Sequence, residues 1–501
     1  MKGVVATSHH LASEAGAEML RDGGNAIDAA IAANAVLCVV YPHMTTIGGD
    51  LFALVWPAGA PGPLGLEGAG RSGEGATIEA MRERGFTSMP VRGAVTVTVP
   101  GTVQAWGRLI ERFGTVGLGR ALAPAAALAR DGFVVTENLA RRLHEDHPWL
   151  SQDAEAARVL PPMMAGMKLR QSELATTLET IGRNGFGGFY FGELGRAIAD
   201  SVTRRGGFVT AADMAGFRSG WVEPLAMSYR DLTIYEMPPP TQGLVAMAML
   251  ARLAGTPSTS LLPGPGFARR LASLRDVAYG LRSHYITDPD FATIPTEPFL
   301  DPSAGAPAPS DTLPDGDTVY LCAADEEGNL VSLIQSVAFE FGSGVVADGT
   351  GILLQNRGCY FSLDPSHVNR LEPRKRTMHS LIPAMAARDG RPLAAFGNMA
   401  GEGQPQIQVQ VAVNLFDRGL EPAEAVAEPR VRVSPAADVF WVEADYPGAA
   451  ELNRSGELPR VELVPPRDQR MGHAQALLID GPGAWRAGAD PRADGSVEHS
   501  T

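Results

Sequence analysis

The sequence is poor in cysteine and in positive charge, and it has no long apolar run. Cys38, Cys322 and Cys359 are its three cysteines, and none belongs to a CxxC pair, so we expect neither a disulfide framework nor a zinc site. The 56 Asp and Glu residues outnumber the 42 Lys and Arg residues, which argues against a nucleic-acid or anionic-membrane partner. The longest apolar stretch, residues 29–40, is too short to cross a bilayer, and the N-terminus lacks the apolar core of a secretion signal. We therefore predict a soluble, cytoplasmic protein.

What the sequence does have is enough apolar material for a large core. Hydrophobic residues make up 45% of the 501 positions, which suits one large domain or two. Residues 13–40 predict a short amphipathic helix, a Gly-Gly break and an alanine-rich helix capped near Asn25. A strand is expected at 51–56, and helices at 101–113 and 267–285. This mixture predicts an α+β or layered architecture rather than a TIM barrel, which needs regular βα alternation.

The composition changes at residues 297–317, where EPFLDPSAGAPAPSDTLPDGD is rich in Pro, Gly and Asp. Such a segment is typical of an exposed, mobile linker. Directly after it, TVYLCAAD and LVSLIQSV flank EEGN, which predicts a hairpin that begins at Thr318. Further strands are expected at 351–354, 393–396 and 407–413, and a loosely structured tail is expected after about residue 481.

A threonine at such a junction can become a nucleophile. If the Asp317–Thr318 bond is cut, the freed α-amino group, with an ordinary pKa of about 7.7–8.0, can accept the proton of the threonine's own hydroxyl. On these residues alone, an ordinary strand after a loop is the other explanation of the junction. A second Asp-Thr pair, Asp311–Thr312, is followed by Leu-Pro, and no strand is expected there. If either bond is cut, we expect it to be the one before Thr318.

Five stretches, in order and at matching spacing, carry a resemblance along almost the whole chain: ATSHHLASEAGAEMLRDGGNAIDAAIAA, PHMTTIGGDLFAL, DTVYLCAADEEGNLVSLIQSV, FGSGVVADGTGILLQN and KRTMHSLIPAM. They resemble the γ-glutamyltransferase family of N-terminal-nucleophile hydrolases. The resemblance implies a four-layer αββα sandwich and self-cleavage before Thr318. It also implies a large subunit, 1–317, and a small subunit, 318–501, that stay associated as one intertwined globular unit.

The resemblance also implies roles for single residues. The Thr318 hydroxyl would attack the carbonyl of Asp317, and later a substrate amide, to form an acyl-enzyme. Ser336 falls where the family has a threonine that hydrogen-bonds the nucleophile, and Ala400–Gly401 align with a Gly-Gly pair that forms the oxyanion hole. Arg71 matches the arginine that pairs with a substrate carboxylate. The alternatives are a polar strand residue, a glycine-rich turn and a surface arginine.

Other positions depart from the family pattern. Tyr360 takes the place of the aspartate that holds a substrate ammonium, and Arg357 replaces a neighbouring glutamine. His379–Ser380 stands where the family has a Ser-Ser pair. A site that loses a carboxylate and gains a cation should reject an ammonium and favour anions. The alternatives are that Arg357 and Tyr360 point away from the pocket and that His379 is an ordinary loop histidine.

The form GDTVYLC, DEEGN and QSV, in a sequence for which we expect no secretion signal, resembles the acylase and oxamate amidohydrolase members of the family more than the glutathione-cleaving ones. The leading hypothesis is a self-processing amidohydrolase for a small carboxylate-bearing amide, oxamate-like or with a longer acyl group. One alternative is a γ-glutamyltransferase or γ-glutamyl hydrolase with an altered amine site, and another is an inactive binding or scaffold protein. We expect no metal and no cofactor, because the histidines are scattered and the implied chemistry needs none. The natural substrate, the balance of hydrolysis and transfer, and the oligomeric state, a dimer of processed pairs included, stay open.

Overall fold

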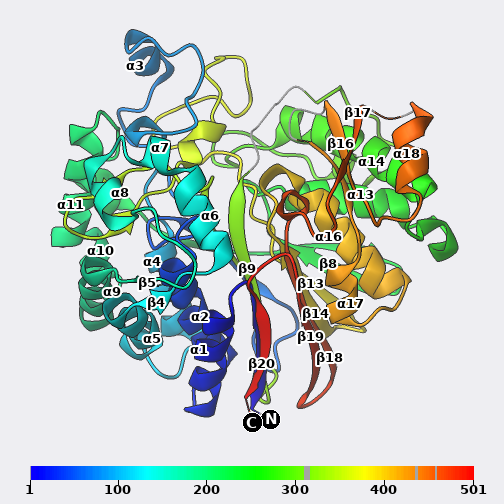
Figure 1. Ribbon diagram of the computed structural model, residues 1–501. Coiled ribbons are helices and arrows are strands. Elements are labelled where there is room, and N and C mark those ends of the chain that lie inside the picture. The colour runs from blue at the N-terminus through cyan, green and yellow to red at the C-terminus, as the bar shows by residue number, and fades with distance from the viewer. Residues whose placement is uncertain (1, 310–315, 435–437, 457, 459, 501) are drawn as a thin grey trace.

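Two antiparallel sheets lie at the centre of the molecule, with helices on either side (Figure 1). The computed structural model describes residues 2–309, 316–434, 438–456, 458 and 460–500. The second Asp-Thr pair, at 311–312, lies outside the described residues. Within them, no helix combines the length and the apolar character that crossing a membrane requires. Because the structure combines these sheets with many helices, the fold is a mixed α+β structure, as the sequence predicted.

The first sheet has seven strands in the order β20-β1-β9-β10-β2-β3-β6. Their bounds are Gly3–Thr7 (β1), Asp50–Trp56 (β2), Leu64–Gly68 (β3), Gly220–Val222 (β6), Asp317–Asp325 (β9), Leu330–Ala338 (β10) and Ser496–Ser500 (β20). The predicted hairpin is confirmed as β9 and β10, which lie between β1 and β2. Strands from before and after Thr318 are thus interleaved in one sheet.

The second sheet has six strands in the order β19-β18-β14-β13-β8-β7. Their bounds are Leu225–Tyr229 (β7), Leu232–Glu236 (β8), Ala384–Arg388 (β13), Arg391–Asn398 (β14), Ala474–Gly481 (β18) and Ala484–Ala489 (β19). Phe52, Tyr320 and Ile334 from the first sheet share one buried cluster with Met385 and Leu477 from the second. Their alternate neighbours face the opposite way, so β9 and β10 are buried on both faces.

Helices cover both outer sides of the paired sheets (Figure 1). Beside the first sheet lie α1 (His10–Arg21), α2 (Ala26–Val40), α4 (Thr102–Phe113), α5 (Leu118–Asp131) and α9 (Ser172–Asn184); beside the second lie α13 (Gly243–Leu253), α14 (Pro265–Tyr285), α16 (Gln404–Ala412) and α17 (Pro422–Ala427). The predicted helices near residues 13–40, 101–113 and 267–285 are confirmed. Asn25 caps α2 as expected, in a reciprocal pair of hydrogen bonds with Asp28.

The remaining elements lie outside the two central sheets. The helices are α3 (Ile78–Glu83), α6 (Glu137–Glu145), α7 (His147–Leu150), α8 (Ala154–Val159), α10 (Gly187–Tyr190), α11 (Glu193–Arg204), α12 (Ala211–Gly216), α15 (Glu297–Leu300) and α18 (Ala449–Ser455). The strands are β4 (Phe133–Val134), β5 (Lys168–Leu169), β11 (Val346–Ala347), β12 (Ile352–Leu353), β15 (Val431–Val433), β16 (Val439–Glu443) and β17 (Arg460–Val464). Strands β14 and β12 confirm two of the later strand predictions, at 393–396 and 351–354.

The strand predicted at 407–413 is wrong, because this segment belongs to helix α16. Its alternating sequence QIQVQVAV imitates a strand with one polar face, but both kinds of side chain are buried here. The amides of Gln406, Gln408 and Gln410 all donate to backbone carbonyls, at 2.8–3.3 Å. The glutamine side chains therefore donate hydrogen bonds to backbone carbonyls in the core. The alternation of polar and apolar residues in the sequence does not mark a side that faces solvent.

Two further expectations are corrected. The tail after about residue 481 is ordered, because β19 completes one sheet and β20 pairs with β1 in the other. The segment 297–317 is not a free linker along its whole length: it begins with α15, in which Phe299 is fully buried. Arg252 also donates to the carbonyl of Phe299 at 3.0 Å. Strand β9 begins at Asp317, one residue before the expected start.

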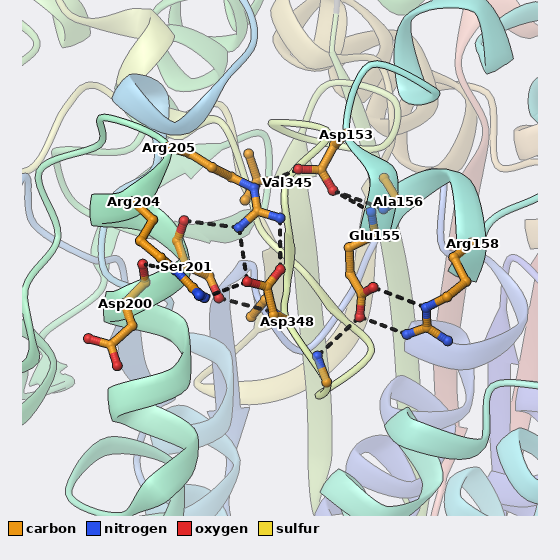
Figure 2. A network of polar contacts seen from close by, with 12 residues as sticks. Asp153, Glu155, Ala156, Arg158, Asp200, Ser201, Arg204, Arg205, Val345 and Asp348 are labelled. Atoms are coloured by element: carbon orange, nitrogen blue, oxygen red, sulfur yellow. Dashed lines mark hydrogen bonds and ion pairs between the residues drawn. The ribbon is translucent and has the colours of Figure 1, made fainter.

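A network of ion pairs joins segments that precede and follow the predicted cleavage site (Figure 2). Arg205, directly after α11, contacts Asp348 at 2.7 Å and Asp153 at 2.6 Å. The backbone N–H of Gly349 donates to Glu155 at 3.0 Å. Asp348 and Gly349 follow the predicted cleavage site and the other three residues precede it. The network would therefore join two chains once the bond is cut.

Candidate active site

The bond between Asp317 and Thr318 lies at the buried start of β9, beside a bulge in β10. The register of the two strands shifts between Gln335 and Ala338, and Ala338 takes a positive φ of 82°. This bulge directs the Ser336 hydroxyl at the bond: its Oγ donates to the carbonyl oxygen of Asp317 at 2.5 Å and accepts from the Ala338 N–H at 2.7 Å. The carbonyl that precedes Thr318 is thus polarised by a buried donor.

The Thr318 side chain is completely buried, and its hydroxyl has a polar neighbour that the sequence reasoning missed. Gln404, at the start of α16, donates from Nε2 to Thr318 Oγ1 at 3.3 Å. A hydroxyl that accepts this bond keeps its own proton free for a second partner. Gln404 lies in the GEGQPQ stretch, next to the predicted oxyanion pair, so its position in that motif was the available signal.

The Ala400–Gly401 pair lies against the residue that precedes Asp317. Gly401 has a φ of 46°, and a Cβ added there would lie 2.2 Å from the backbone nitrogen of Gly316. Ala400 and Asp317 line the same cavity. The structure therefore brings the predicted oxyanion pair beside the predicted cleavage site, and Gly401 has no room for a side chain.

A buried acidic residue, Asp50, lies across from Ser336 and accepts hydrogen bonds from several neighbours. Asp50 begins β2, directly across from Ser336 on β10. Its side chain accepts from the N–H of Gly70 and from Gln355 Nε2, each at 3.1 Å. Burial raises the pKa of Asp50 to about 7, although the charge of Arg357 opposes this shift. Sequence reasoning missed Asp50, whose only mark is its place after the Gly-Gly turn.

Asp50 also holds the ring of His379. His379 Nε2 lies 3.1 Å from Asp50 Oδ2, and both side chains are buried. Burial and the charge of Arg357 lower the pKa of His379 well below its usual value, so the ring is neutral. We place its one proton on Nε2, facing Asp50. His379 is thus a buried, neutral ring that Asp50 holds in place.

Arg357, Tyr360 and Ser380 form a buried polar group next to Asp50. Arg357 Nη1 donates to Ser380 Oγ at 3.3 Å, and its Nε lies 4.0 Å from Asp50 Oδ2. Among the described residues, Arg357 Nε and Nη2 and the Tyr360 hydroxyl have no hydrogen-bond partner. A Cβ added to Gly316 would lie 3.1 Å from the Tyr360 hydroxyl. The group therefore reaches the residues that precede Thr318.

Arg71 does not join this group. Its guanidinium pairs with Asp288 at 3.1 Å and with Asp290 at 2.5 Å, and it donates to the carbonyl of Arg374 at 2.9 Å. About a third of its side chain is exposed, at 36%. The structure thus places Arg71 in a surface ion-pair network, and its role toward a substrate stays a prediction. Among the described residues, no group of three or more His, Cys, Asp or Glu could hold a metal ion.

This geometry brings the Thr318 hydroxyl, the hydrogen-bonded carbonyl of Asp317 and the Ala400–Gly401 pair to one buried peptide bond. The sequence model of the gamma-glutamyltranspeptidase family matches residues 12–500. The chain is 37% identical to the glutathione hydrolase-like YwrD proenzyme of Bacillus subtilis, over 99% of this chain and 98% of the relative. It is 34% identical to the oxamate amidohydrolase proenzyme of Klebsiella pneumoniae, over 99% and 98%.

A solved structure gives the same picture. The cephalosporin acylase of Bacillus halodurans superposes with a TM-score of 0.92 at 35% identity, covering 99% of this chain and 96% of that one. The chain therefore belongs to the gamma-glutamyltranspeptidase family and is an enzyme of that family, a hydrolase made as a proenzyme.

Proposed function

We propose that the protein cuts its own chain before Thr318 and then hydrolyses a small amide that carries a carboxylate. The observation that carries this proposal is the 2.5 Å hydrogen bond from Ser336 Oγ to the Asp317 carbonyl oxygen, beside the Thr318 hydroxyl. The donor polarises the carbonyl that the hydroxyl attacks, and it stabilises the negative charge that develops on the oxygen.

Self-cleavage follows from this arrangement. Thr318 Oγ adds to the carbonyl carbon of Asp317, the C–N bond breaks, and the nitrogen takes up a proton to become the α-amino group of Thr318. Water then hydrolyses the ester and leaves a carboxylate on Asp317. We infer that the products are a large subunit, 1–317, and a small subunit, 318–501, held in one αββα sandwich because their strands interleave.

The freed α-amino group then serves as the base for the hydroxyl of its own residue. The hydroxyl attacks the substrate carbonyl, the amine leaves, and the acyl ester on Thr318 is hydrolysed by water. We assign the Ala400–Gly401 N–H groups to the oxyanion, a contact whose loss typically costs about 10²–10³ in rate. Gln404 holds the Thr318 hydroxyl, and Ser336 holds the carbonyl that precedes it.

The substrate assignment rests on Arg357. Within the part of the chain that the structure describes, two nitrogens of the buried Arg357 guanidinium have no hydrogen-bond partner, which is costly, so a ligand that supplies a carboxylate would stabilise the site. Tyr360 and Ser380 add hydroxyls, and Arg71 is already paired with aspartates, so Arg357 is the better carboxylate partner. Relatives named for oxamate and for cephalosporins fit this class.

A second candidate is hydrolysis of γ-glutamyl amides, which the similarity to a glutathione hydrolase-like proenzyme favours. It requires a partner for the substrate ammonium, and Tyr360 stands where that carboxylate is expected. The scaffold alternative gains no support from a site in which the Thr318 hydroxyl, the Ser336 donor and the Ala400–Gly401 pair all lie at one bond.

The test has two parts. Intact mass and N-terminal sequencing of the purified protein should give two chains, the smaller beginning Thr-Val-Tyr, whereas Thr318→Ala should stay whole. The processed protein should hydrolyse oxamate or a glutaryl amide faster than γ-glutamyl-p-nitroanilide. One uncut, inactive chain would contradict the whole proposal. A preference for the γ-glutamyl amide would replace it by the second candidate.

A further inference from the structure

Two backbone segments that are separate in the sequence carry much of the candidate site. Residues 379–380, the acyl-side segment, contact Arg357 through the Ser380 hydroxyl. Residues 400–404, the oxyanion-side segment, carry the predicted oxyanion pair and end at Gln404, whose amide contacts Thr318 Oγ1. The separation of the two segments therefore determines whether the acyl group and the carbonyl oxygen of one substrate can be held at the same time.

One buried glutamine, Gln242, bridges these two segments. It directly precedes α13, and its side chain is fully buried. Its Nε2 donates to the carbonyl of Ser380 at 3.1 Å and to the carbonyl of Gly401 at 3.2 Å. Its backbone N–H donates to the carbonyl of His379 at 2.9 Å. A single side-chain amide thus spans the gap between the acyl-side segment and the oxyanion-side segment.

The oxygen of this amide fixes the orientation of the whole group. Arg282, on α14, donates from Nη1 to Gln242 Oε1 at 3.3 Å. If the amide were turned over, its oxygen would face two carbonyl oxygens and its N–H groups would face a guanidinium. The positions of the amide nitrogen and oxygen therefore follow from their neighbours. A side chain at this position needs two donor hydrogens and one acceptor to make all three contacts.

The same arginine holds the oxyanion-side segment at a second point. Arg282 Nη1 lies 2.8 Å from Glu402 Oε1 and 2.6 Å from Glu402 Oε2, and the two side chains are 1% and 2% exposed. Tyr279, one turn earlier on α14, donates its hydroxyl to the carbonyl of Glu402. Because separating the partners of a buried ion pair is strongly unfavourable, α14 anchors this segment.

A peptide plane transmits this anchoring to a predicted oxyanion donor. The Gly403 N–H donates to the carbonyl of Ala400 at 2.7 Å. In a trans peptide, the Ala400 carbonyl and the Gly401 N–H point in opposite directions. The hydrogen bond to the carbonyl therefore also directs the Gly401 N–H. Catalytic groups have to be held to within about 0.5 Å of their productive positions, so the surrounding contacts decide how well such a donor works.

The bridging residues and the bridged segments belong to different sides of the predicted cut. Gln242, Tyr279 and Arg282 precede Thr318 in the chain, whereas both segments follow it. After self-cleavage, the large subunit would hold two pieces of the small subunit in register. The contacts made by Gln242 are therefore contacts between the two subunits of the processed enzyme.

We propose that Gln242 is a positioning residue for substrate turnover: it keeps the acyl-side and oxyanion-side segments at the separation that the reaction needs, and Arg282 keeps its amide in the required orientation. This inference rests on the proposed function. Gln242 touches none of the reacting atoms. It acts through the oxyanion pair, which receives the charge on the substrate oxygen when Thr318 Oγ1 attacks, while the acyl carboxylate stays at Arg357.

Two variants remove the bridge in different ways. Gln242→Met keeps the length of the side chain without its donors, and Gln242→Glu keeps its shape but puts an acceptor where the donors were. Both should still split before Thr318, because Ser336 on β10 holds that carbonyl. In the split proteins we expect kcat to fall about 10²-fold and KM to change less than about threefold, because a displaced oxyanion donor acts on the transition state.

Gln410→Met is the matched control. Gln410 is a buried glutamine of α16 whose Nε2 also donates to two backbone carbonyls, those of Gln406 at 3.0 Å and Val431 at 2.8 Å. This variant loses the same kind of hydrogen bonds in the core, so it should lower the thermal unfolding midpoint much as Gln242→Met does. Its kcat should stay close to that of the wild type.

Hydrogen–deuterium exchange provides a measurement that needs no turnover. Read by mass spectrometry, it reports local opening of the backbone in peptides that cover residues 377–383 and 399–404. In Gln242→Met, both peptides should exchange faster than in the wild type, whether or not the chain has split. In Gln410→Met, the exchange of both peptides should match the wild type.

The outcomes separate this inference from the proposed function. Wild-type kcat in split Gln242→Met would overturn the inference, whichever amide serves as substrate. A raised KM at unchanged kcat would also overturn it, since the residue would then shape the acyl pocket alone, as would an equal loss of kcat in Gln410→Met. If the wild type hydrolyses no oxamate, glutaryl amide or γ-glutamyl amide, the proposed function fails. Exchange then decides: faster exchange in both peptides supports the bridge, and unchanged exchange overturns it.

Discussion

At the scale of single residues, one hydroxyl connects two events. Ser336 donates to the carbonyl of the bond to be cut, and it lies in the bulge of β10 that faces Asp317 and Thr318, the residue that must act again afterwards. Its position depends on the β10 bulge, where Ala338 takes a positive φ that costs of order 1–3 kcal/mol. The fold thus holds a strained backbone at the place where a donor has to point inward.

The first prediction concerns this donor. Ser336→Ala should slow self-cleavage by about 10²-fold, because the developing oxyanion loses its donor. Ser336→Thr should restore the rate, since the hydroxyl returns. The measurement is the time course of chain splitting on denaturing gels after cell-free synthesis. Ser332→Ala, another buried serine of β10, is the control and should process normally. Wild-type processing in Ser336→Ala would show that the contact has no part in cleavage.

The second prediction assigns the carboxylate partner. Arg357→Gln should lower kcat/KM for a carboxylate-bearing amide about tenfold to hundredfold, mainly through KM, because a charge-assisted pair is lost. Chain splitting in this variant reports that it folds. Arg71→Gln, measured beside it, should have the smaller effect because Arg71 is engaged by Asp288 and Asp290. If Arg71→Gln lowers kcat/KM more than Arg357→Gln does, Arg71 is the carboxylate partner and the assignment to Arg357 is wrong.

The sequence identified some site residues and could not identify others. Thr318, Ser336 and Gly401 stand in motifs whose spacing marks them, and the structure brings them to one bond. Asp50 and Gln404 also stand in recognisable stretches, but their contacts depend on the pairing of β2 with β10 and on the approach of α16 to β9. A single sequence does not report a contact between distant partners, such as Gln404 and Thr318, which are 86 positions apart.

At the scale of elements, local sequence patterns were reliable where a cap or a turn marks the end of an element. The capping of α2 by Asn25 and the β9–β10 hairpin followed from neighbouring residues alone. The pattern failed for α16, because its glutamines are buried, and for β20, because pairing with β1 orders it. In both cases tertiary context decided what local propensity left open.

The third prediction belongs to the contacts between elements. In processed protein, Arg205→Ala should lower the thermal unfolding midpoint more than in the uncut Thr318→Ala background. The reason is that the Arg205–Asp348 pair then joins separate chains, without the covalent tether that keeps them together. Arg158→Ala is the matched control: Arg158 pairs with Glu155 and Glu173, all before the cut, so its effect should be equal in both backgrounds.

Two equal shifts for Arg205→Ala would contradict this assignment. They would mean that the interleaved sheets alone hold the subunits together and that the network of Figure 2 contributes nothing specific to their association. Exposed ion pairs individually contribute about 0.2–1 kcal/mol, so the comparison of backgrounds matters more than the size of either shift.

At the scale of the whole molecule, the core encloses every cysteine. Cys38, Cys322 and Cys359 are free and buried, and burial raises the pKa of Cys38 and of Cys359 to about 12. The fourth prediction is that the native protein reacts with a thiol reagent at neutral pH only after unfolding, when all three become labelled, because the thiolate is the reactive form. The measurement is mass spectrometry before and after denaturant. Rapid labelling of native protein would contradict the packing around the modified cysteine.

The pairing of β1 with β20 has a consequence for protein engineering. The N–H of Lys2 donates to the carbonyl of Ser500 at 2.8 Å, so the two ends of the chain lie side by side, in the sheet that also holds Thr318. A short peptide could join them, and the chain could be reopened between Asp317 and Thr318. Such a circular permutant would be synthesised with Thr318 directly after its initiator methionine. Removal of that methionine alone would then free the α-amino group of Thr318, and the enzyme would need no self-cleavage to become active.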